Sequence, residues 1–238
     1  MPVFYSGHNR LFKKPNFLNK RIGGSVAITS STLWVQALKN LSLEIRQGDR
    51  LGLIGHNGAG KSTLLKVIAG IIPCSSGHIE INGKVGTIFG NESNLSNELT
   101  GRETIEFYFK IFNSDEKSKS YQEDIISFTE LGDYIDLPLR VYSAGMTARL
   151  FAALITSVHK DILLIDEGIG AGDLAFQMKF SQRLDKFLTC ASILVAASHS
   201  FELLKQYCNK GLVLEHGEIR FFGPINEAIE HYTSGLKA

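Results

Sequence analysis

A glycine-rich loop between an apolar strand and a helix constrains this chain more than any other feature. Residues 55–62 read Gly-His-Asn-Gly-Ala-Gly-Lys-Ser and match the pattern GxxxxGK[ST]. The apolar run 51–54 before the loop is typical of a buried strand, and residues 61–69 continue as a helix. Glycines let such a loop wrap closely around phosphates, with backbone N–H groups and the positive end of the helix facing the anion. We therefore expect a nucleoside triphosphate to bind here.

The positions of this loop have separate expected roles. Lys61 should bridge the β- and γ-phosphates, and the Ser62 hydroxyl should bind Mg²⁺. The predicted ATP-binding residues are Gly55, His56, Asn57, Gly58, Ala59, Gly60, Lys61, Ser62 and Thr63. The alternative is a chance glycine-rich turn, against which the fixed spacing over eight positions and the strand-to-helix context argue.

A second apolar run ends in two carboxylates. Residues 162–165 are wholly apolar, as in a strand buried on both faces, and Asp166 and Glu167 follow. Ligands of open α/β sheets bind at the carboxyl ends of such strands. We expect Asp166 to hold Mg²⁺ and Glu167 to accept a proton from the attacking water. The alternative is a strand that ends in two solvated acids.

The order of the remaining elements predicts an α/β fold with a parallel sheet, an antiparallel β portion and an inserted helical subdomain. Residues 1–33 are expected to be an N-terminal extension or insertion, and residues 34–238 to form the main domain with the helical subdomain at about 92–158. Expected strands lie at 41–45, 51–54, 79–81, 162–165, 193–197, 212–214 and 218–222, with an Asn-Gly hairpin turn after residue 81. Expected helices outside the insert lie at 61–69, 174–188, 201–207 and 225–232.

Composition argues against several classes of protein. A formal net charge of +1 gives no electrostatic case for binding nucleic acid. Cys74, Cys190 and Cys208 lie far apart, which argues against a disulfide framework and a zinc site. No apolar stretch approaches the roughly 20 residues that span a bilayer. We expect a soluble protein.

Residues 142–146 read Tyr-Ser-Ala-Gly-Met and lie shortly before the acidic strand. They resemble the signature motif of ABC transporter ATPases, in the form typical of enzymes that export bacterial surface polysaccharides. The loop at 55–62 then corresponds to the family's Walker A motif. Ser143 is an expected helix N-cap, and with Gly145 it would face an anion. The resemblance implies that this end closes over ATP bound to the opposite subunit of a homodimer; read alone, Ser143 is only a helix cap.

Other family motifs can be placed by the same resemblance. His199 follows an apolar strand and resembles the switch histidine, which implies a catalytic role beside Glu167. Asp173 occupies the place of the D-loop aspartate. Asn91 stands where the Q-loop usually has Gln and has a shorter side chain. The aromatic residue that stacks on adenine is Trp34 or Tyr5, and the sequence leaves this open.

Residues 48–56, 99–103 and 170–173 resemble the ATPases of O-antigen export, with capsule and teichoic-acid exporters as close relatives. This resemblance implies a peripheral subunit at the cytoplasmic face of the inner membrane. It implies two integral-membrane permease subunits as partners and a lipid-linked polysaccharide as cargo. The chain stops at Ala238, which leaves no room for the carbohydrate-binding domain of some relatives, so no direct glycan binding is expected.

Two other functions of the family fit the sequence less well. A soluble ABC ATPase of DNA repair or translation generally carries tandem nucleotide domains or long coiled coils, and neither pattern is found in this sequence. A nucleotide sensor without catalysis would normally have a damaged acidic strand or switch motif, whereas Asp166, Glu167 and His199 are all present.

Overall fold

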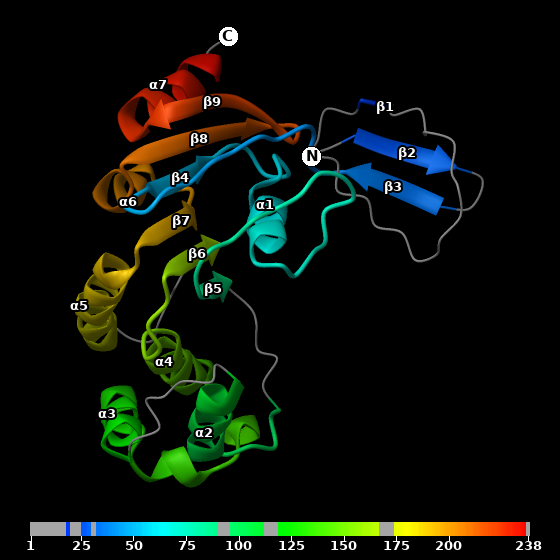
Figure 1. The fold of residues 1–238 in the computed structure, drawn as a ribbon. Coiled ribbons are helices and arrows are strands. Elements are labelled where there is room, and N and C mark those ends of the chain that lie inside the picture. The colour runs from blue at the N-terminus through cyan, green and yellow to red at the C-terminus, as the bar shows by residue number, and fades with distance from the viewer. Residues whose placement is uncertain are drawn as a thin grey trace. The chain divides into compact units, whose positions relative to one another are not determined.

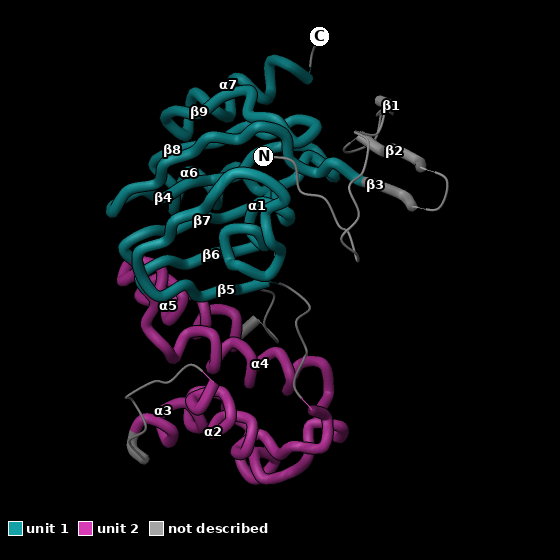
Figure 2. Tube along the Cα trace, turned by 45° about the vertical axis from the view of Figure 1, so that its right-hand side comes forward, with its two compact units in different colours: residues 1–89, 161–167, 192–238 teal, residues 90–160, 168–191 magenta. Residues whose placement is uncertain are grey.

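The computed structural model describes most of the chain (Figure 1). The described residues are 18–19, 25–29, 32–89, 96–111, 119–166 and 174–236, of which 18–19, 25–29, 32–34, 119–120 and 174–175 are described in their backbone only. The chain divides into two compact units (Figure 2). Unit 1 contains residues 1–89, 161–167 and 192–238, and unit 2 contains residues 90–160 and 168–191.

A six-stranded sheet forms the centre of unit 1, with the strand order β5-β6-β7-β4-β8-β9 (Figure 1). All neighbouring pairs are parallel except β8 and β9, which form an antiparallel hairpin. The bounds are β4 Arg50–Ile54, β5 Val85–Phe89, β6 Ile162–Asp166, β7 Ile193–Ala197, β8 Lys210–Glu215 and β9 Glu218–Pro224. The predicted α/β fold with a parallel sheet is confirmed.

The two faces of this sheet are covered by different helices. Leu51 and Leu53 of β4 belong to the core cluster that includes helix α1 (Lys61–Ile68). Ile54 belongs instead to the cluster with α6 (Phe201–Tyr207) and α7 (Ile225–Gly235). Successive side chains of a strand point to opposite faces, so a continuous apolar run is what a strand covered on both faces requires.

A separate antiparallel sheet lies in the N-terminal segment, with the order β1-β2-β3. Its strands are β1 Leu18–Asn19, β2 Ser25–Thr29 and β3 Thr32–Gln36. The hairpin of β2 and β3 pairs Ser25 with Gln36 and Thr29 with Thr32. These strands were not expected, because serine, threonine and glycine interrupt the apolar pattern here.

Two expected strands are wrong. Residues 41–45 keep the expected alternation, since Leu41, Leu43 and Ile45 pack against the core, but they are not assigned to a strand. Alternating burial is thus present without a strand pairing. Residues 79–81 do not form a hairpin arm either. The chain bends near Gly83, and the Lys84 N–H donates to the Asp161 carboxylate at 2.7 Å.

Strand β5 was missed. It pairs in parallel with β6 from Val85 and Ile162 to Phe89 and Asp166. Its sequence Val-Gly-Thr-Ile-Phe has no continuous apolar run, and only alternate residues are buried. An edge strand needs fewer apolar residues than a central one, so periodicity alone did not reveal it.

Unit 2 is helical. Its elements are α2 Gly101–Ile111, α3 Lys119–Thr129, the 3₁₀ turns η1 Gly132–Asp136 and η2 Leu139–Val141, α4 Ala144–Ile155 and α5 Leu174–Cys190. One hydrophobic cluster joins them, with Phe109, Ile125, Leu150 and Phe176 at its centre. Among the described residues, no helix has both the length and the apolar character needed to cross a bilayer.

Candidate functional site

The glycine-rich loop leaves the carboxyl end of β4 and leads into α1, as predicted. Gly55 (φ +156°) and Gly60 (φ +111°) have backbone conformations that suit glycine. A Cβ atom at Gly55 would lie 2.4 Å from the carbonyl oxygen of Leu214. At Gly60 it would lie 2.9 Å from the carbonyl oxygen of Ala37. The loop is therefore closely packed on its protein side, which explains both glycines.

The turn between β8 and β9 supports this loop from behind. The Gly217 N–H donates to the Ala59 carbonyl at 3.0 Å, and the Gly217 carbonyl accepts the Lys39 N–H at 2.7 Å. The rings of His56 and His216 lie 5.1 Å apart, centroid to centroid. No local pattern in the sequence predicts this support. The His216-Gly217 turn is visible in the sequence, but its contact with a loop more than a hundred residues earlier is not.

Lys61 is buried and is held over the loop. The residue is only 7% exposed, and its ammonium donates to the carbonyls of Gly55 at 2.6 Å and His56 at 3.2 Å. Helix α1 begins after Gly60, which provides no side-chain cap. A cation and an uncapped helix N-terminus thus occur together at the loop, an arrangement that suits an anion.

The acidic strand ends at the same edge of the sheet. Asp166 of β6 pairs with Ala197 of β7, and Ala197 pairs with Leu53 of β4. The three residues therefore lie in one row across neighbouring strands, two residues before the loop begins at Gly55. Strands in a sheet are about 4.8 Å apart, so the Cα atoms of Asp166 and Leu53 lie about 10 Å apart.

The side chains at this edge offer oxygen atoms. Ser62 is exposed on the first turn of α1, and Asp166 is half-buried. Hydroxyl and carboxylate oxygens are hard ligands, and Mg²⁺ commonly combines one or two of them with phosphate oxygens and water. These residues therefore fit Mg²⁺. His199 is exposed two residues beyond the end of β7, and Ser200 then caps α6 by accepting the Leu203 N–H at 3.3 Å.

Several predicted site residues lie outside the described part of the chain. They are Glu167, Asp173, Asn91 and Tyr5, together with the side chain of Trp34. Their roles stay predictions from the sequence.

Ser143 lies in unit 2 and is the N-cap of α4, as predicted. Its hydroxyl accepts the Met146 N–H at 3.2 Å. Ser143 and Gly145 are both exposed, and a Cβ atom at Gly145 would meet only the Ser143 oxygen, at 3.9 Å. Tyr142 anchors the residue before the cap through a hydrogen bond from its hydroxyl to the Tyr134 carbonyl, 2.8 Å long. Burial raises the pKa of Tyr142, so the hydroxyl stays a donor. The start of α4 is thus a fixed and accessible helix N-terminus.

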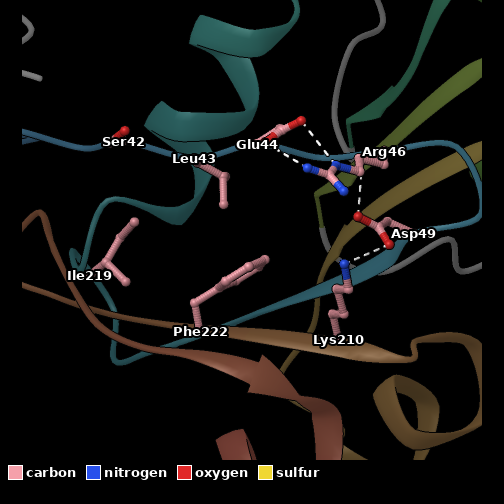
Figure 3. Close-up of a pocket in the computed structure, with 8 residues that line it drawn as sticks. All are labelled: Ser42, Leu43, Glu44, Arg46, Asp49, Lys210, Ile219 and Phe222. Carbon is pink, nitrogen blue, oxygen red and sulfur yellow. Dashed lines mark hydrogen bonds and ion pairs between the residues drawn. The ribbon is translucent and has the colours of Figure 1, made fainter.

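A pocket of about 300 Å³ in unit 1 lies away from these residues (Figure 3). It lies next to Asp49, directly before β4, and Lys210, the first residue of β8, and hence at the amino ends of these parallel strands. Its charged side chains are paired, Arg46 with Glu44 at 3.0 Å and Lys210 with Asp49 at 2.7 Å. The other residues lining it are Ser42, Leu43, Ile219 and Phe222. The glycine-rich loop and Asp166 lie at the opposite, carboxyl ends of the strands.

Comparison with known proteins places these features in a family. Residues 38–170 match the family described as ABC transporter. The chain is 48% identical over 200 residues to the O-antigen export system ATP-binding protein RfbE of Yersinia enterocolitica, covering 84% of this chain and 82% of that protein. It is 38% identical to the teichoic acids export ATP-binding protein TagH of Staphylococcus epidermidis, covering 84% and 76%. TagH of Lactococcus lactis is 37% identical to this chain. That match covers 90% of this chain but only 45% of the TagH protein.

Solved structures of low sequence identity share the fold. The ATP-binding cassette MJ0796, in a dimeric post-hydrolysis state bound to ADP and Pi, superposes with a TM-score of 0.66 at 21% identity. The match covers 87% of this chain and 97% of that one. A second structure, the ATP-binding subunit of an ABC transporter, gives a TM-score of 0.66 at 20% identity, covering 89% and 92%.

Proposed function

The chain belongs to the ABC transporter family as one of its ATP-hydrolysing members, and we propose that it drives the export of a lipid-linked surface polysaccharide, with O-antigen as the favoured class. The observation that carries the catalytic part is the buried Lys61 over an uncapped helix N-terminus, at the sheet edge where Asp166 ends β6.

The residues of the loop bind and orient ATP. The ammonium of Lys61 exchanges its carbonyl partners for oxygens of the β- and γ-phosphates. The N–H groups at the start of α1 donate to the same phosphates, and Thr63, half-buried in the first turn, lies beside them. The Gly217 contact with Ala59 keeps the loop in this shape.

Ser62 and Asp166 would hold Mg²⁺, whose charge neutralises the triphosphate when it is bound. Their oxygen-only donor set supports this assignment. Glu167 acts as the general base that takes a proton from the attacking water. His199 follows β7 at the same sheet edge and donates a hydrogen bond toward the γ-phosphate.

A second copy of the chain completes each site. In this proposal Ser143 and Gly145 of one copy close over the ATP held by Lys61 of the other, and Asp173 lines the contact between the copies. The exposed start of α4, where Ser143 caps the helix and Gly145 leaves its backbone open, supports this role. Asn91 takes the Q-loop position, and either Trp34 or Tyr5 stacks on adenine.

The cargo and partners follow from the relatives. Identity is 48% to an O-antigen export protein and 35–38% to seven further proteins, six of which are teichoic-acid export proteins. This difference favours O-antigen, with teichoic acid or capsule as the second choice. We assign the chain to the cytoplasmic face of the inner membrane, where two copies drive two permease subunits.

The catalytic proposal is tested with Glu167→Gln. This change removes the base and leaves the phosphate cradle intact, so ATP affinity should stay within about twofold while turnover falls by about 10²–10⁴. Affinity is measured with a fluorescent ATP analogue and turnover by phosphate release. Turnover within a few-fold of wild type would contradict the role of Glu167.

The cargo is tested in the bacterium that carries this gene. Deletion should deplete surface polysaccharide while its lipid-linked precursor accumulates on the inner leaflet. Wild-type protein should reverse both effects, and the Glu167→Gln protein should reverse neither. Unchanged surface polysaccharide in the deletion strain would rule out this cargo while leaving the ATPase assignment intact.

A further inference from the structure

Three helices of unit 2 are joined by one half-exposed carboxylate. Glu130 follows the last residue of α3, and its two oxygens take different partners. One accepts the Lys179 ammonium of α5 at 2.6 Å, and the other accepts the Arg149 guanidinium of α4 at 3.1 Å. Glu130, Arg149 and Lys179 are called the Glu130 clamp below.

The clamp is fixed by more than its ion pairs. Arg149 also donates to the Thr129 carbonyl and Lys179 to the Phe128 carbonyl, both at 3.4 Å, so that two cations lie at the C-terminal end of α3. The Arg149 guanidinium lies 4.7 Å from the ring centroid of Phe176. These contacts lower the pKa of Glu130, first through the hydrogen bond from Lys179 and then through the charges of both cations. The carboxylate is therefore ionised at neutral pH.

The backbone at Glu130 is unusual. Its φ of +58° lies in the left-handed region, which glycine adopts freely and a glutamate does not. Ion pairs as exposed as these contribute little to stability. A strained residue that gives little stability in return is a candidate for a functional role.

The clamp lies at matching depths on two helices. Arg149 lies five residues beyond the first residue of α4, and Lys179 lies five residues beyond the first residue of α5. Five residues correspond to about 8 Å along a helix axis. The residue before α4 is Ser143, its N-cap. In the proposed function Ser143 belongs to the contact between copies of the chain.

We propose that Glu130 is a positioning residue that ties α4 to α3 and α5, so that Ser143 at the start of α4 is held in place for the partner copy. The inference rests on the proposed function. Loosening the clamp should leave ATP binding at Lys61 unchanged and impair the step in which Ser143 meets the partner copy. Closure of the ATP-loaded dimer then becomes slower, and turnover falls at every ATP concentration.

Two substitutions separate this role from a structural one. Glu130→Gln keeps the shape and removes the charge. Glu130→Gly also removes the carboxylate, but it relieves the positive φ, so the protein should unfold at the same temperature as wild type or higher. Both variants should keep ATP affinity within twofold and lose about tenfold in kcat at unchanged KM. A structural role would lower stability and activity together.

Two controls match these changes. Asn40→Gly introduces glycine at another exposed residue of positive φ (+45°), outside the clamp. Asp136→Asn removes a carboxylate that is paired twice with Arg102, at 2.7 and 3.1 Å, in the same unit. Both controls should hydrolyse ATP at the wild-type rate.

The clamp should also behave as one unit. Lys179→Gln should reproduce the loss of turnover, and the double variant with Glu130→Gln should be no slower than the slower single variant. Additive losses, or turnover of Glu130→Gly within twofold of wild type, would overturn the inference while leaving the proposed function standing. A wild-type chain that neither binds nor hydrolyses ATP would overturn both.

Discussion

Lys61 and Asp49 are buried charged residues that lie beyond opposite ends of β4, one after its carboxyl end and one directly before Arg50. Each is satisfied by polar partners. Lys61 donates to two loop carbonyls, whereas Asp49 accepts the Arg46 N–H at 2.9 Å and pairs with Lys210 at 2.7 Å. The two residues are buried to a similar degree but have different roles, because only Lys61 lies at the glycine-rich loop.

Lys61→Ala should weaken ATP binding by at least about tenfold or abolish hydrolysis, because the triphosphate loses its fixed cation and two loop carbonyls lose their donor. Titration with a fluorescent ATP analogue measures the affinity. Lys66→Ala, near the other end of α1, is the matched control and should bind as wild type does. Equal affinity and turnover in Lys61→Ala and wild type would contradict the phosphate-loop assignment.

Asp49→Asn should lower the free energy of unfolding by about 2 kcal/mol at pH 7, because it removes the charge of a buried carboxylate that accepts the Arg46 N–H and pairs with Lys210. Burial alone would raise the pKa of Asp49, but the Arg46 N–H and the Lys210 ammonium outweigh it and hold the pKa below its usual 3.8. The ionised carboxylate therefore stabilises the fold fully above pH of about 5, and this contribution is lost as the pH falls through the lowered pKa.

Urea unfolding at several pH values measures this dependence. The difference between wild type and Asp49→Asn should be constant from pH 5 to 7 and shrink as the pH falls through the lowered pKa of Asp49. Asp136→Asn, which removes an exposed ion pair, should leave the urea midpoint nearly unchanged at every pH. A difference for Asp49→Asn that persists unchanged at low pH would show that its charge is not what stabilises the fold.

At the level of elements, the sequence predicted the central strands of the sheet. It predicted the segments around them only in part. Apolar runs revealed β4, β6 and β7, because strands covered on both faces need them. The signal failed at β5, an edge strand with Gly86 and Thr87 in it, and at residues 41–45, where the alternation is present without a strand. Periodicity reports which side chains are buried, whereas a strand also depends on a distant backbone partner.

The features of the candidate site also fall into those that the sequence predicted and those that it did not. The strand–loop–helix arrangement around Gly55–Gly60 and the Ser143 cap depend on local sequence motifs, so the sequence predicted them. The support from Gly217 and the clamp at Glu130 depend on contacts between residues far apart in the chain, and no local pattern marks them.

The β8–β9 turn allows a test of this support. Gly217 has φ +80°, and a Cβ atom there would lie 2.3 Å from the Ala37 carbonyl oxygen, so Gly217→Ala must displace the turn. Gly70 has a similar φ of +73° with nothing within 4 Å of the added atom, which makes Gly70→Ala the matched control. We expect losses in the free energy of unfolding of about 3 and about 1 kcal/mol, respectively.

Only Gly217→Ala should also weaken ATP binding, because it moves the residue that holds the Ala59 carbonyl. Chemical unfolding and nucleotide titration on both variants provide the two measurements. Equal ATP affinity in the two alanine variants would mean that the turn does not shape the phosphate loop.

At the level of the whole molecule, the proposed composite site predicts complementation between two defective copies. A Lys61→Ala chain paired with a Ser143→Arg chain places both defects in one site and leaves the other site intact. Each parental homodimer has two damaged sites. Mixing should therefore restore ATP-dependent closure at one site, measured by energy transfer between labelled chains.

The mixed dimers must first be shown to form, by mass measurement of differently tagged chains. Closure is the primary measurement, and ATP turnover is the secondary one because the two sites can depend on each other. If closure in proven mixed dimers does not exceed that of either parent, Ser143 is only the cap of α4.

The strand order of the main sheet also bears on how the protein is made. Strand β4 is translated early, yet its two neighbours contain Val195 and Lys210, which pair with Leu51. A ribosome adds about 5–20 residues per second, so β4 waits roughly 7–30 s for the first of these partners. During this time its apolar residues and the loop after it have no sheet to join. The nascent chain should thus depend on chaperones until its last quarter emerges, and truncation before β8 should yield aggregates and no ATPase.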